Sequence, residues 1–234
     1  MAKTKKQTES VIPEEPISQP LPIDLDVRIN SIIPNGSGKL RATGSVNMNG
    51  CFAVRGVKIY EGTNGLFVNM PSYKGANDKY KEYCHPITKE FREQLNNAVL
   101  DAYNQAVRLG NLRPTEHEPS DPASAQPMKV DVRITALTPG NTNQRASATV
   151  NLNDSFALKG VKVMEGSNGL FVHTPSYKAG EKYNEHYFPV TKEFREQFHN
   201  AVLTAYDEAI AQSQGASEQD YSDYSEEPQF VQSM

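Results

Sequence analysis

Two stretches of this chain are nearly identical. EGTNGLFVNMPSYK occupies residues 61–74, and EGSNGLFVHTPSYK occupies residues 165–178. Further matches flank them: DVRI recurs at 26–29 and 131–134, and TKEFREQ recurs at 88–94 and 191–197, followed each time by NAVLxAY. The offset between the copies falls from 105 to 104 to 103, so two single-residue deletions explain the drift. Such self-similarity is the signature of a repeated structural unit. The chain therefore contains two tandem copies of one domain.

Composition divides the rest of the chain into folded and unfolded segments. We expect copy one to occupy residues 23–113 and copy two to occupy residues 128–212. Residues 114–127 contain four prolines and no apolar periodicity, which is typical of a linker. Residues 1–22 also carry four prolines, and residues 213–234 are rich in Ser, Gln, Glu and Asp, so we expect both ends to be disordered.

Each copy begins with the pattern of an antiparallel sheet. Apolar and polar side chains alternate at residues 25–33, as in a half-buried strand. Asn49-Gly50 favours a two-residue hairpin, and Asn64-Gly65 is a second hairpin signal. The strands expected around these turns are 40–48, 51–60 and 66–70.

A polar stretch and a helix complete the copy. Pro71 ends strand pairing, and we expect a loop from there to residue 85. Thr88 can cap the N-terminus of a helix that ends at Gly110. The apolar residues at helical spacing are Phe91, Leu95, Ala98, Val99, Ala102, Ala106 and Leu109, repeated in copy two as Phe194, Phe198, Ala201, Val202, Ala205, Ala209 and Ile210. The predicted fold class is α+β: two tandem copies of an antiparallel β-meander of about four strands, each followed by one long helix.

The order of these motifs resembles the septation protein SpoVG family, known in Gram-positive and some other bacteria. The resemblance covers about 23–109 and 128–211. It rests on Asp26-Val27-Arg28, the Arg41-Ala42 strand, GxNGLFVxxPS from Gly62, His85-Pro86-Ile87 and Ala98-Val99-Leu100-x-x-Tyr103. Family members are small, single-copy and dimeric, and are described as site-specific DNA- and RNA-binding regulators with genetic links to septation and sporulation. The resemblance implies that the two fused copies pair here as an intrachain pseudo-dimer. It leaves further self-association open.

The sequence departs from the family pattern at three places. After Pro-Ser, family members usually carry two basic residues, but here the pair is Tyr-Lys in both copies. The family's His-Pro-Ile becomes Phe188-Pro189-Val190 in copy two. At the helix start a family Arg matches Arg92 and Arg195, while a Lys two residues on is replaced by Gln. The resemblance therefore implies a nucleic-acid surface that is differently tuned.

The charge distribution is compatible with nucleic-acid binding, although the whole chain has a net charge of −4. Copy one holds 12 Lys and Arg against 8 Asp and Glu, while copy two holds 9 of each. Phosphate contacts need clustered cations and not a basic whole chain. In the polar stretch of copy one, three lysines alternate with tyrosines on which bases could stack. The candidates are Tyr73, Lys74, Lys79, Tyr80 and Lys81 in copy one, and Tyr177, Lys178 and Lys182 in copy two. The alternative is a solvated loop whose tyrosines fold back onto the sheet.

Arginines supply the remaining candidates. Arg41 and Arg145 lie in the second predicted strand of each copy. Arg92 and Arg195 lie in the first helical turn. The residue four positions after Arg92 is Asn96, so Arg92 has no acidic i,i+4 partner, which favours an external role.

Enzymatic chemistry finds little support. The five histidines show no metal-ligand spacing, so no metal site and no cofactor are predicted. Cys51 and Cys84 correspond to Ser155 and Tyr187, so neither thiol recurs as a nucleophile would. Two cysteines do not make a disulfide framework, and no apolar run reaches the roughly 20 residues of a membrane span. We expect a non-enzymatic, cytoplasmic protein without membrane contact.

Two functions remain at this point. One is a regulator of septation and gene expression that binds DNA, RNA or both. The other is a protein–protein adaptor that acts without nucleic acid. The acidic tail has three interpretations: a solubilising segment, a cover for the basic loop, or a segment that binds a protein partner.

Overall fold

The same series of elements appears twice in the computed structural model, which describes residues 22–33, 38–75, 77–110, 128–138, 140 and 142–222. Copy one contains β1 (Leu25–Ile32), β2 (Leu40–Met48), β3 (Phe52–Gly62), β4 (Gly65–Asn69), β5 (Ser72–Lys74), β6 (Tyr80–Glu82), β7 (Cys84–Pro86) and α1 (Lys89–Leu109). Copy two contains β8 (Val130–Leu137), β9 (Gln144–Leu152), β10 (Phe156–Gly166), β11 (Gly169–His173), β12 (Ser176–Ala179), β13 (Lys182–Glu185), β14 (Tyr187–Pro189) and α2 (Lys192–Ser222). The α+β prediction, with two meanders and two helices, is confirmed.

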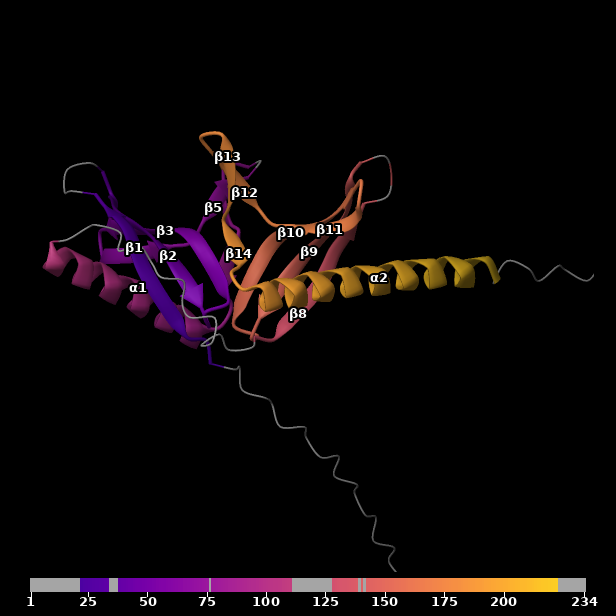
Figure 1. Cartoon of the computed structure of the whole chain (residues 1–234), viewed down its shortest axis with the longest axis horizontal. Coiled ribbons are helices and arrows are strands. Elements are labelled where there is room, and N and C mark those ends of the chain that lie inside the picture. The colour runs from indigo at the N-terminus through magenta and orange to yellow at the C-terminus, as the bar shows by residue number, and fades with distance from the viewer. Residues whose placement is uncertain are drawn as a thin grey trace, which may run out of the picture.

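The described residues and the end of α2 can be compared with the predicted domain boundaries. Residues 1–21, the linker 114–127 and residues 223–234 lie outside the described residues. The helix α2 continues to Ser222 and passes the boundary expected at residue 212. Figure 1 shows that its C-terminal half runs beyond the sheet of copy two. Much of this stretch consists of Ala, Gln and Glu, which are good helix formers and allow the helix to continue without a sheet beneath it.

The turns follow the sequence signals. Asn49 and Gly50 both have positive φ values, 51° and 67°, as a tight hairpin between right-twisted strands requires. The Cys51 amide donates to the Met48 carbonyl at 3.1 Å and closes the turn. In copy two Asn153 and Asp154 take over this conformation.

The stretch expected to be a loop is instead three short strands. β5 pairs with β6 as a small hairpin, and β12 pairs with β13 in the same way. β7 pairs with β10 of copy two, and β14 pairs with β3 of copy one. The partners of β7 and β14 lie in the other copy, so local sequence periodicity did not reveal these strands.

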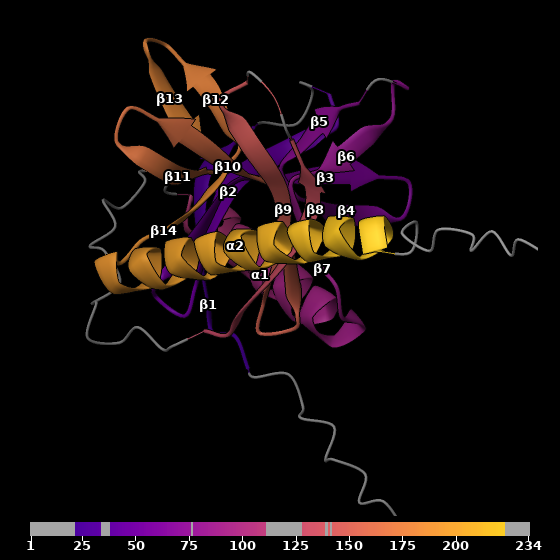
Figure 2. The ribbon, with the colours of Figure 1, turned by 90° about the vertical axis from the view of Figure 1, so that its right-hand side faces the viewer.

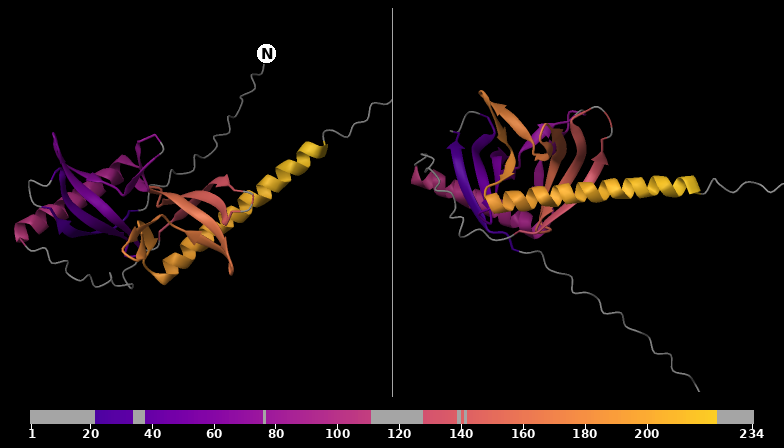
Figure 3. Two further views of the ribbon diagram at one scale, coloured as in Figure 1. Left: turned by 90° about the horizontal axis from the view of Figure 1, so that it is seen from above. Right: turned by 45° about the vertical axis from the view of Figure 1, so that its right-hand side comes forward.

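This reciprocal strand exchange joins the two copies. β3 is long enough to pair with β4 through Lys58–Gly62 and with β14 through Phe52–Val54, so the exchanged strand completes an edge that β4 leaves open. Backbone bonds extend the junction: the Val190 amide donates to the Cys51 carbonyl at 2.7 Å, and the Ile87 amide donates to the Ser155 carbonyl at 2.8 Å. The two views in Figure 3 show the copies side by side, and Figure 1 labels β14 between their sheets. The copies thus pair within one chain.

Each helix covers its own sheet and also reaches the other copy. α1 packs on β1 and β4, and α2 packs on β8 and β11, as Figure 2 shows for α2. Phe91, in the first turn of α1, meets Phe156 of copy two edge-to-face with ring centroids 6.0 Å apart. Phe194 of α2 meets Phe52 in the same way at 6.1 Å. One continuous core therefore runs through both copies.

The helix ends mostly match the prediction. The Thr88 hydroxyl accepts a bond from the Phe91 amide at 3.2 Å, and Gly110 adopts a left-handed C-cap. Phe91, Leu95 and Val99 are buried, but Leu109 is 72% exposed, so its predicted place on the buried face was wrong. The last turn of α1 lies past β1 and has no sheet to cover (Figure 1).

The exchange junction is asymmetric in its side chains. Cys84 of β7 and Tyr187 of β14 occupy equivalent positions, and both are fully buried. The Tyr187 hydroxyl donates to the Lys159 carbonyl at 2.7 Å, and Lys159 is adjacent to Leu158, with which Cys84 pairs. A large and a small side chain therefore share one junction, and close packing makes each depend on the other.

Exchanging these two residues tests that dependence. Tyr187→Cys should lower the free energy of unfolding by about 3 kcal/mol or more, because it empties a buried ring site. Cys84→Tyr should cost about 1–3 kcal/mol by overpacking. The double exchange should cost less than the sum of the two single changes, as measured by urea denaturation. Cys51→Ser is the control, because copy two has Ser155 at that position. Strictly additive effects would show that Cys84 and Tyr187 do not pack together.

Candidate nucleic-acid interface

The two short hairpins lie on the side of the sheets away from the helices (Figure 1), where ring contacts join their bases and from where the hairpins spread apart (Figure 2). In β5–β6, Lys74 pairs with Tyr80 and Tyr73 pairs with Lys81. In β12–β13, Lys178 pairs with Tyr183. We call these two hairpins together the crest. Most of the lysines and tyrosines predicted from the sequence therefore come together in one place, although they belong to both copies.

A row of four rings in contact, stacked at its centre and tilted at both ends, joins the two hairpins of the crest. The ring centroids of Tyr73 and Tyr83 are 4.7 Å apart, those of Tyr83 and His186 are 4.4 Å apart, and those of His186 and Tyr177 are 4.8 Å apart. Tyr83 and His186 precede β7 and β14, so strand exchange places them face to face at the junction of the copies. The stacking of these central rings was not predicted, because it depends on contact between the copies.

The tyrosines of the crest fall into two classes. Tyr73 and Tyr177 end the row of rings and remain 41% and 39% exposed, so each keeps part of a ring open to solvent. Tyr80 and Tyr183 stand clear of the row and are 75% and 71% exposed. Exposed rings of this kind are platforms on which unpaired bases can stack. Tyr183 was not predicted as a contact, although it is the counterpart of Tyr80.

The crest lysines are largely available to an external anion. Lys74 is 2.7 Å from Asp78, but both side chains are exposed, and such a pair is weak. Among the described residues, no carboxylate forms an ion pair with Lys79, Lys81, Lys178 or Lys182. The crest also carries Asp78, Glu82, Glu181 and Glu185, so its five lysines leave it close to neutral. Further positive charge on this side of the protein comes from the neighbouring sheet faces.

A glycine bulge in each sheet places two further cations beside the crest. The sequence RGVK occupies residues 55–58 of β3, and KGVK occupies residues 159–162 of β10. Gly56 and Gly160 have φ values of 78° and 80° and sit at register shifts, each as an extra residue in its strand. Side chains three positions apart in a strand normally face opposite sides, and the extra residue brings both cations to the exposed side. Arg55, Lys58, Lys159 and Lys162 are all exposed beside the crest.

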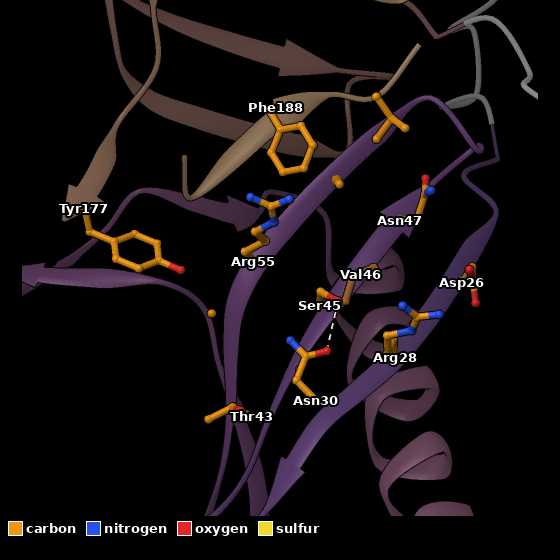
Figure 4. Close-up of a pocket in the computed structure, with 14 residues that line it drawn as sticks. Asp26, Arg28, Asn30, Thr43, Ser45, Val46, Asn47, Arg55, Tyr177 and Phe188 are labelled. Atoms are coloured by element: carbon orange, nitrogen blue, oxygen red, sulfur yellow. Dashed lines mark hydrogen bonds between the residues drawn. The ribbon is translucent and has the colours of Figure 1, made fainter. Parts of the chain in front are cut away.

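An open groove of about 660 Å³ lies between the sheet of copy one and the crest. Figure 4 shows its lining from β1 and β2 on one side and from copy two on the other. The Cζ atom of Arg55 lies 4.3 Å from the centre of the Phe188 ring, which is a cation–π contact. We call this the Arg55 groove; its lining includes Arg28, Asn30, Ser45, Arg55, Tyr177 and Phe188. A smaller groove of about 320 Å³ beside the sheet of copy two is lined by Tyr73, Tyr83, Lys159, Lys162 and His173, among others.

Comparison with known proteins identifies the family. A family model described as SpoVG matches residues 24–105 and again residues 128–208 of the chain, which together are more than half of it. The chain belongs to the SpoVG family. A septation protein SpoVG from Caldicellulosiruptor saccharolyticus is 40% identical over 85 residues, which are 36% of this chain and 94% of that relative.

Other SpoVG relatives show the same coverage. The septation protein SpoVG of Clostridium perfringens is 43% identical over 84 residues, which are 36% of this chain and 91% of the relative. The protein of the same name from Treponema denticola is 39% identical over 80 residues, which are 34% of this chain and 84% of the relative. Each match spans most of the relative but only about a third of this chain. One SpoVG relative of this kind therefore corresponds to one copy.

Two of the predicted arginines, Arg41 and Arg145, form ion pairs within their own copies. Arg41 Nε donates to Glu61 Oε2 at 2.7 Å, and its Nη1 donates to the Gly38 carbonyl at 2.7 Å. In copy two, Arg145 makes the equivalent ion pair with Glu165. These bonds tie the start of the second strand of each copy to the third strand. These bonds give both arginines a structural role, and a phosphate contact by either of them stays a prediction.

The arginines at the helix starts are also engaged. Arg92 Nη2 donates to the Pro86 carbonyl at 2.8 Å, and Arg195 Nη2 donates to the Pro189 carbonyl at 3.1 Å. The Gln residues that replace a family lysine bond to the first residues of each copy: Gln94 to the Ile23 carbonyl and Gln197 to the Met128 carbonyl, both at 2.9 Å. One N–H group of Arg92 thus anchors the end of the exchanged strand β7, while its predicted external contact stays a prediction.

The described residues offer little support for other kinds of functional site. No group of three or more His, Cys, Asp or Glu side chains is placed there to hold a metal ion. No described helix has an apolar stretch long enough to cross a bilayer. Burial raises the pKa of the Cys51 thiol to about 11 and also raises the pKa of the Cys84 thiol. Both thiols therefore stay protonated at neutral pH and are poor nucleophiles.

Burial also affects the histidines at the junction. It lowers the pKa of His85 and of His186, and the nearby cations Lys159 and Lys58 respectively act in the same direction. The Nδ1 atoms of both rings are buried and have no hydrogen-bond partner in the described part of the chain. The stacked row therefore favours a neutral imidazole at its centre.

The ion pair of Arg41 gives a stability prediction. Arg41→Gln should lower the free energy of unfolding by roughly 1 kcal/mol, because the pair is only partly exposed and is supported by the Gly38 carbonyl. Glu61→Gln should have a similar effect, and the double variant should cost less than the sum. Urea denaturation measures the three values. A matching loss of nucleic-acid affinity in Arg41→Gln, with stability unchanged, would overturn the structural assignment.

The histidines give a pH prediction. A histidine whose pKa is lowered in the folded protein binds protons more readily when unfolded, so its contribution to stability is present above about pH 6.5 and falls as the pH drops through that value. The urea midpoint should therefore fall between pH 7.5 and pH 5. His186→Tyr should reduce this fall, because the counterpart Tyr83 shows that a tyrosine fits the row. An unchanged pH profile in this variant would show that His186 does not titrate with folding.

Proposed function

We propose that this SpoVG protein binds nucleic acid through the crest and the two grooves beside it. The observation that carries the proposal is the gathering, on the face away from the helices, of exposed tyrosines and lysines from both copies. A surface with cations for phosphates and rings for bases is what binding to single strands requires. The relatives are named septation proteins, and we propose that this chain acts as a nucleic-acid-binding regulator linked to septation.

The distribution of charge along the chain is consistent with nucleic-acid binding by the face that carries the crest. The four cations of RGVK and KGVK lie beside the crest, while the tail 213–234 alone contributes five acidic residues and no basic ones. Phosphate binding depends on the local cluster of cations, and release of counterions makes it sensitive to salt. We therefore expect modest affinity with a strong salt dependence. Both DNA and RNA present the phosphates and bases that such a face would contact.

The crest lysines test the proposal. Fluorescence anisotropy with labelled 20-nucleotide single strands of DNA and RNA, and with a 20-base-pair duplex, should show binding that weakens between 50 and 200 mM salt. Lys74→Gln, Lys79→Gln and Lys81→Gln together should weaken binding to single strands. They should also reduce the slope of log affinity against log salt by about 2, at roughly 0.7 per lost phosphate contact.

A second triple variant controls for loss of charge alone. Lys89, Lys129 and Lys192 lie away from the crest, where each faces a carboxylate: Glu93, Asp154 and Glu196. Changing all three to Gln should leave the affinity nearly unchanged. Equal losses in the two triple variants, or no binding by the unaltered protein at 50 mM salt, would refute the proposal. The second of these outcomes would leave the protein–protein adaptor as the better account.

A further inference from the structure

The Arg55 groove is a composite of the two copies and has chemistry of its own. One wall comes from β1, β2 and β3 of copy one, and the other comes from Tyr177 and Phe188 of copy two (Figure 4). The Phe188 ring reaches Arg55 because β14 pairs with β3, where Phe188 lies opposite Ala53. The groove is therefore complete only when the copies have exchanged strands.

We propose that the Arg55 groove holds one unstacked nucleotide of a single-stranded nucleic acid. This inference rests on the proposed function and assigns a specific site within it. The groove volume of about 660 Å³ lies within the range of ordinary small-ligand sites, about 300–1,000 Å³. It is sunk between the sheet and the crest, so a base that is stacked and paired in a duplex would have to leave its helix to enter.

The Arg55 guanidinium supplies the anchor. Its Cζ atom lies 4.3 Å from the centre of the Phe188 ring, a contact that restrains the guanidinium, and no carboxylate among the described residues forms an ion pair with it. A guanidinium held in this way keeps its N–H edge free for a two-point contact with a phosphate or with a base edge. Arg28 lies across the groove and adds a second positive charge (Figure 4).

The floor of the groove carries neutral polar groups suited to a base. The Ser45 hydroxyl donates to Asn30 Oδ1 at 3.5 Å. Thr43, whose hydroxyl lies 2.7 Å from Ser31 Oγ, also lines the groove. Amides and hydroxyls both donate and accept hydrogen bonds, as the edges of bases do. Asp26 is the acidic side chain in the lining, so the groove as a whole favours an anionic ligand that also has a polar edge.

Copy two does not repeat this site. The position of Arg55 is taken by Lys159, and the position of Phe188 is taken by His85, which pairs with Ala157 as Phe188 pairs with Ala53. Lys159 lies near His85 and helps to lower the pKa of its imidazole. Copy two therefore has a lysine near a histidine where copy one has an arginine over a phenylalanine ring. A lysine presents a point charge and not a planar fork. Among the described residues, an arginine packed on a ring is therefore present in the groove of copy one and not at the equivalent place in copy two.

This asymmetry provides a variant that the fold already tolerates. Arg55→Lys with Phe188→His converts the groove to the residues that copy two already accommodates. Arg108→Lys, in the last turn of α1 and outside both grooves, is the control for the loss of one guanidinium. Circular dichroism and urea denaturation should show that both variants remain folded. The Arg55→Lys, Phe188→His variant should weaken binding to a single-stranded 12-mer by about tenfold, near the low end of the range for losing one stacked base. Arg108→Lys should leave the affinity unchanged.

Two further arms separate a nucleotide site from simpler explanations. An abasic unit scanned along the 12-mer should weaken binding to the unaltered protein at one position, and should have little effect on the Arg55→Lys, Phe188→His variant. Duplex binding should be nearly equal for both proteins. An equal loss on duplex and single strand would overturn the inference, because Arg55 would then be a plain phosphate contact. Tight binding of free mononucleotides would overturn the claim that the ligand is part of a strand.

The outcomes also distinguish this inference from the proposed function. If the crest triple variant loses affinity while the Arg55→Lys, Phe188→His variant binds single strands normally, the groove is not a nucleotide site but the protein still binds nucleic acid. If the unaltered protein binds no nucleic acid at 50 mM salt, both fail.

Discussion

The pairing of β7 with β10 and of β14 with β3 is the contact on which the rest of the structure depends. β3 and β10 each have a stretch of edge that their own copy leaves unpaired, and a buried strand edge without partners is costly. The other copy fills each stretch with three residues that lie just before its helix. Because the helix follows directly, Phe91 and Phe194 enter the core of the opposite copy. Neither sheet is complete without the other copy.

The same exchange builds the candidate site. Tyr83 and His186 immediately precede the exchanged strands, so pairing those strands stacks the two rings and holds the two hairpins together as the crest. It also places Phe188 over Arg55. The site is therefore made by the interface between the copies and not by either copy alone. Joining both copies in one chain lets the two halves differ, as Cys84 and Tyr187 do in the core and Phe188 and His85 do at the grooves.

The division of labour between the copies is more specific than total charge suggests. Copy one is the more basic half in composition, but the crest hairpins together are close to neutral. The additional exposed cations beside the crest belong to RGVK and KGVK, where a glycine bulge turns two cations to the same side of a strand. The main difference between the copies is the chemistry of their grooves, an arginine on a ring in one and a lysine beside a histidine in the other.

The sequence by itself determined the repeat, the four-strand meander, both helix starts and the family, because these depend on local periodicity, turn chemistry and caps. It also identified the lysines and tyrosines that the structure brings together at the crest. It did not show the exchanged strands, the stacked Tyr83 and His186, or the internal bonds of Arg41 and Arg92. The exchanged strands and the stacked rings depend on contacts between residues more than 60 positions apart in the chain. The bonds of Arg41 and Arg92 depend on which acceptors lie near each side chain in the folded protein. Only the tertiary structure decided them, since strand edges and buried rings are satisfied by whatever segment packs against them, and the local sequence does not specify that segment.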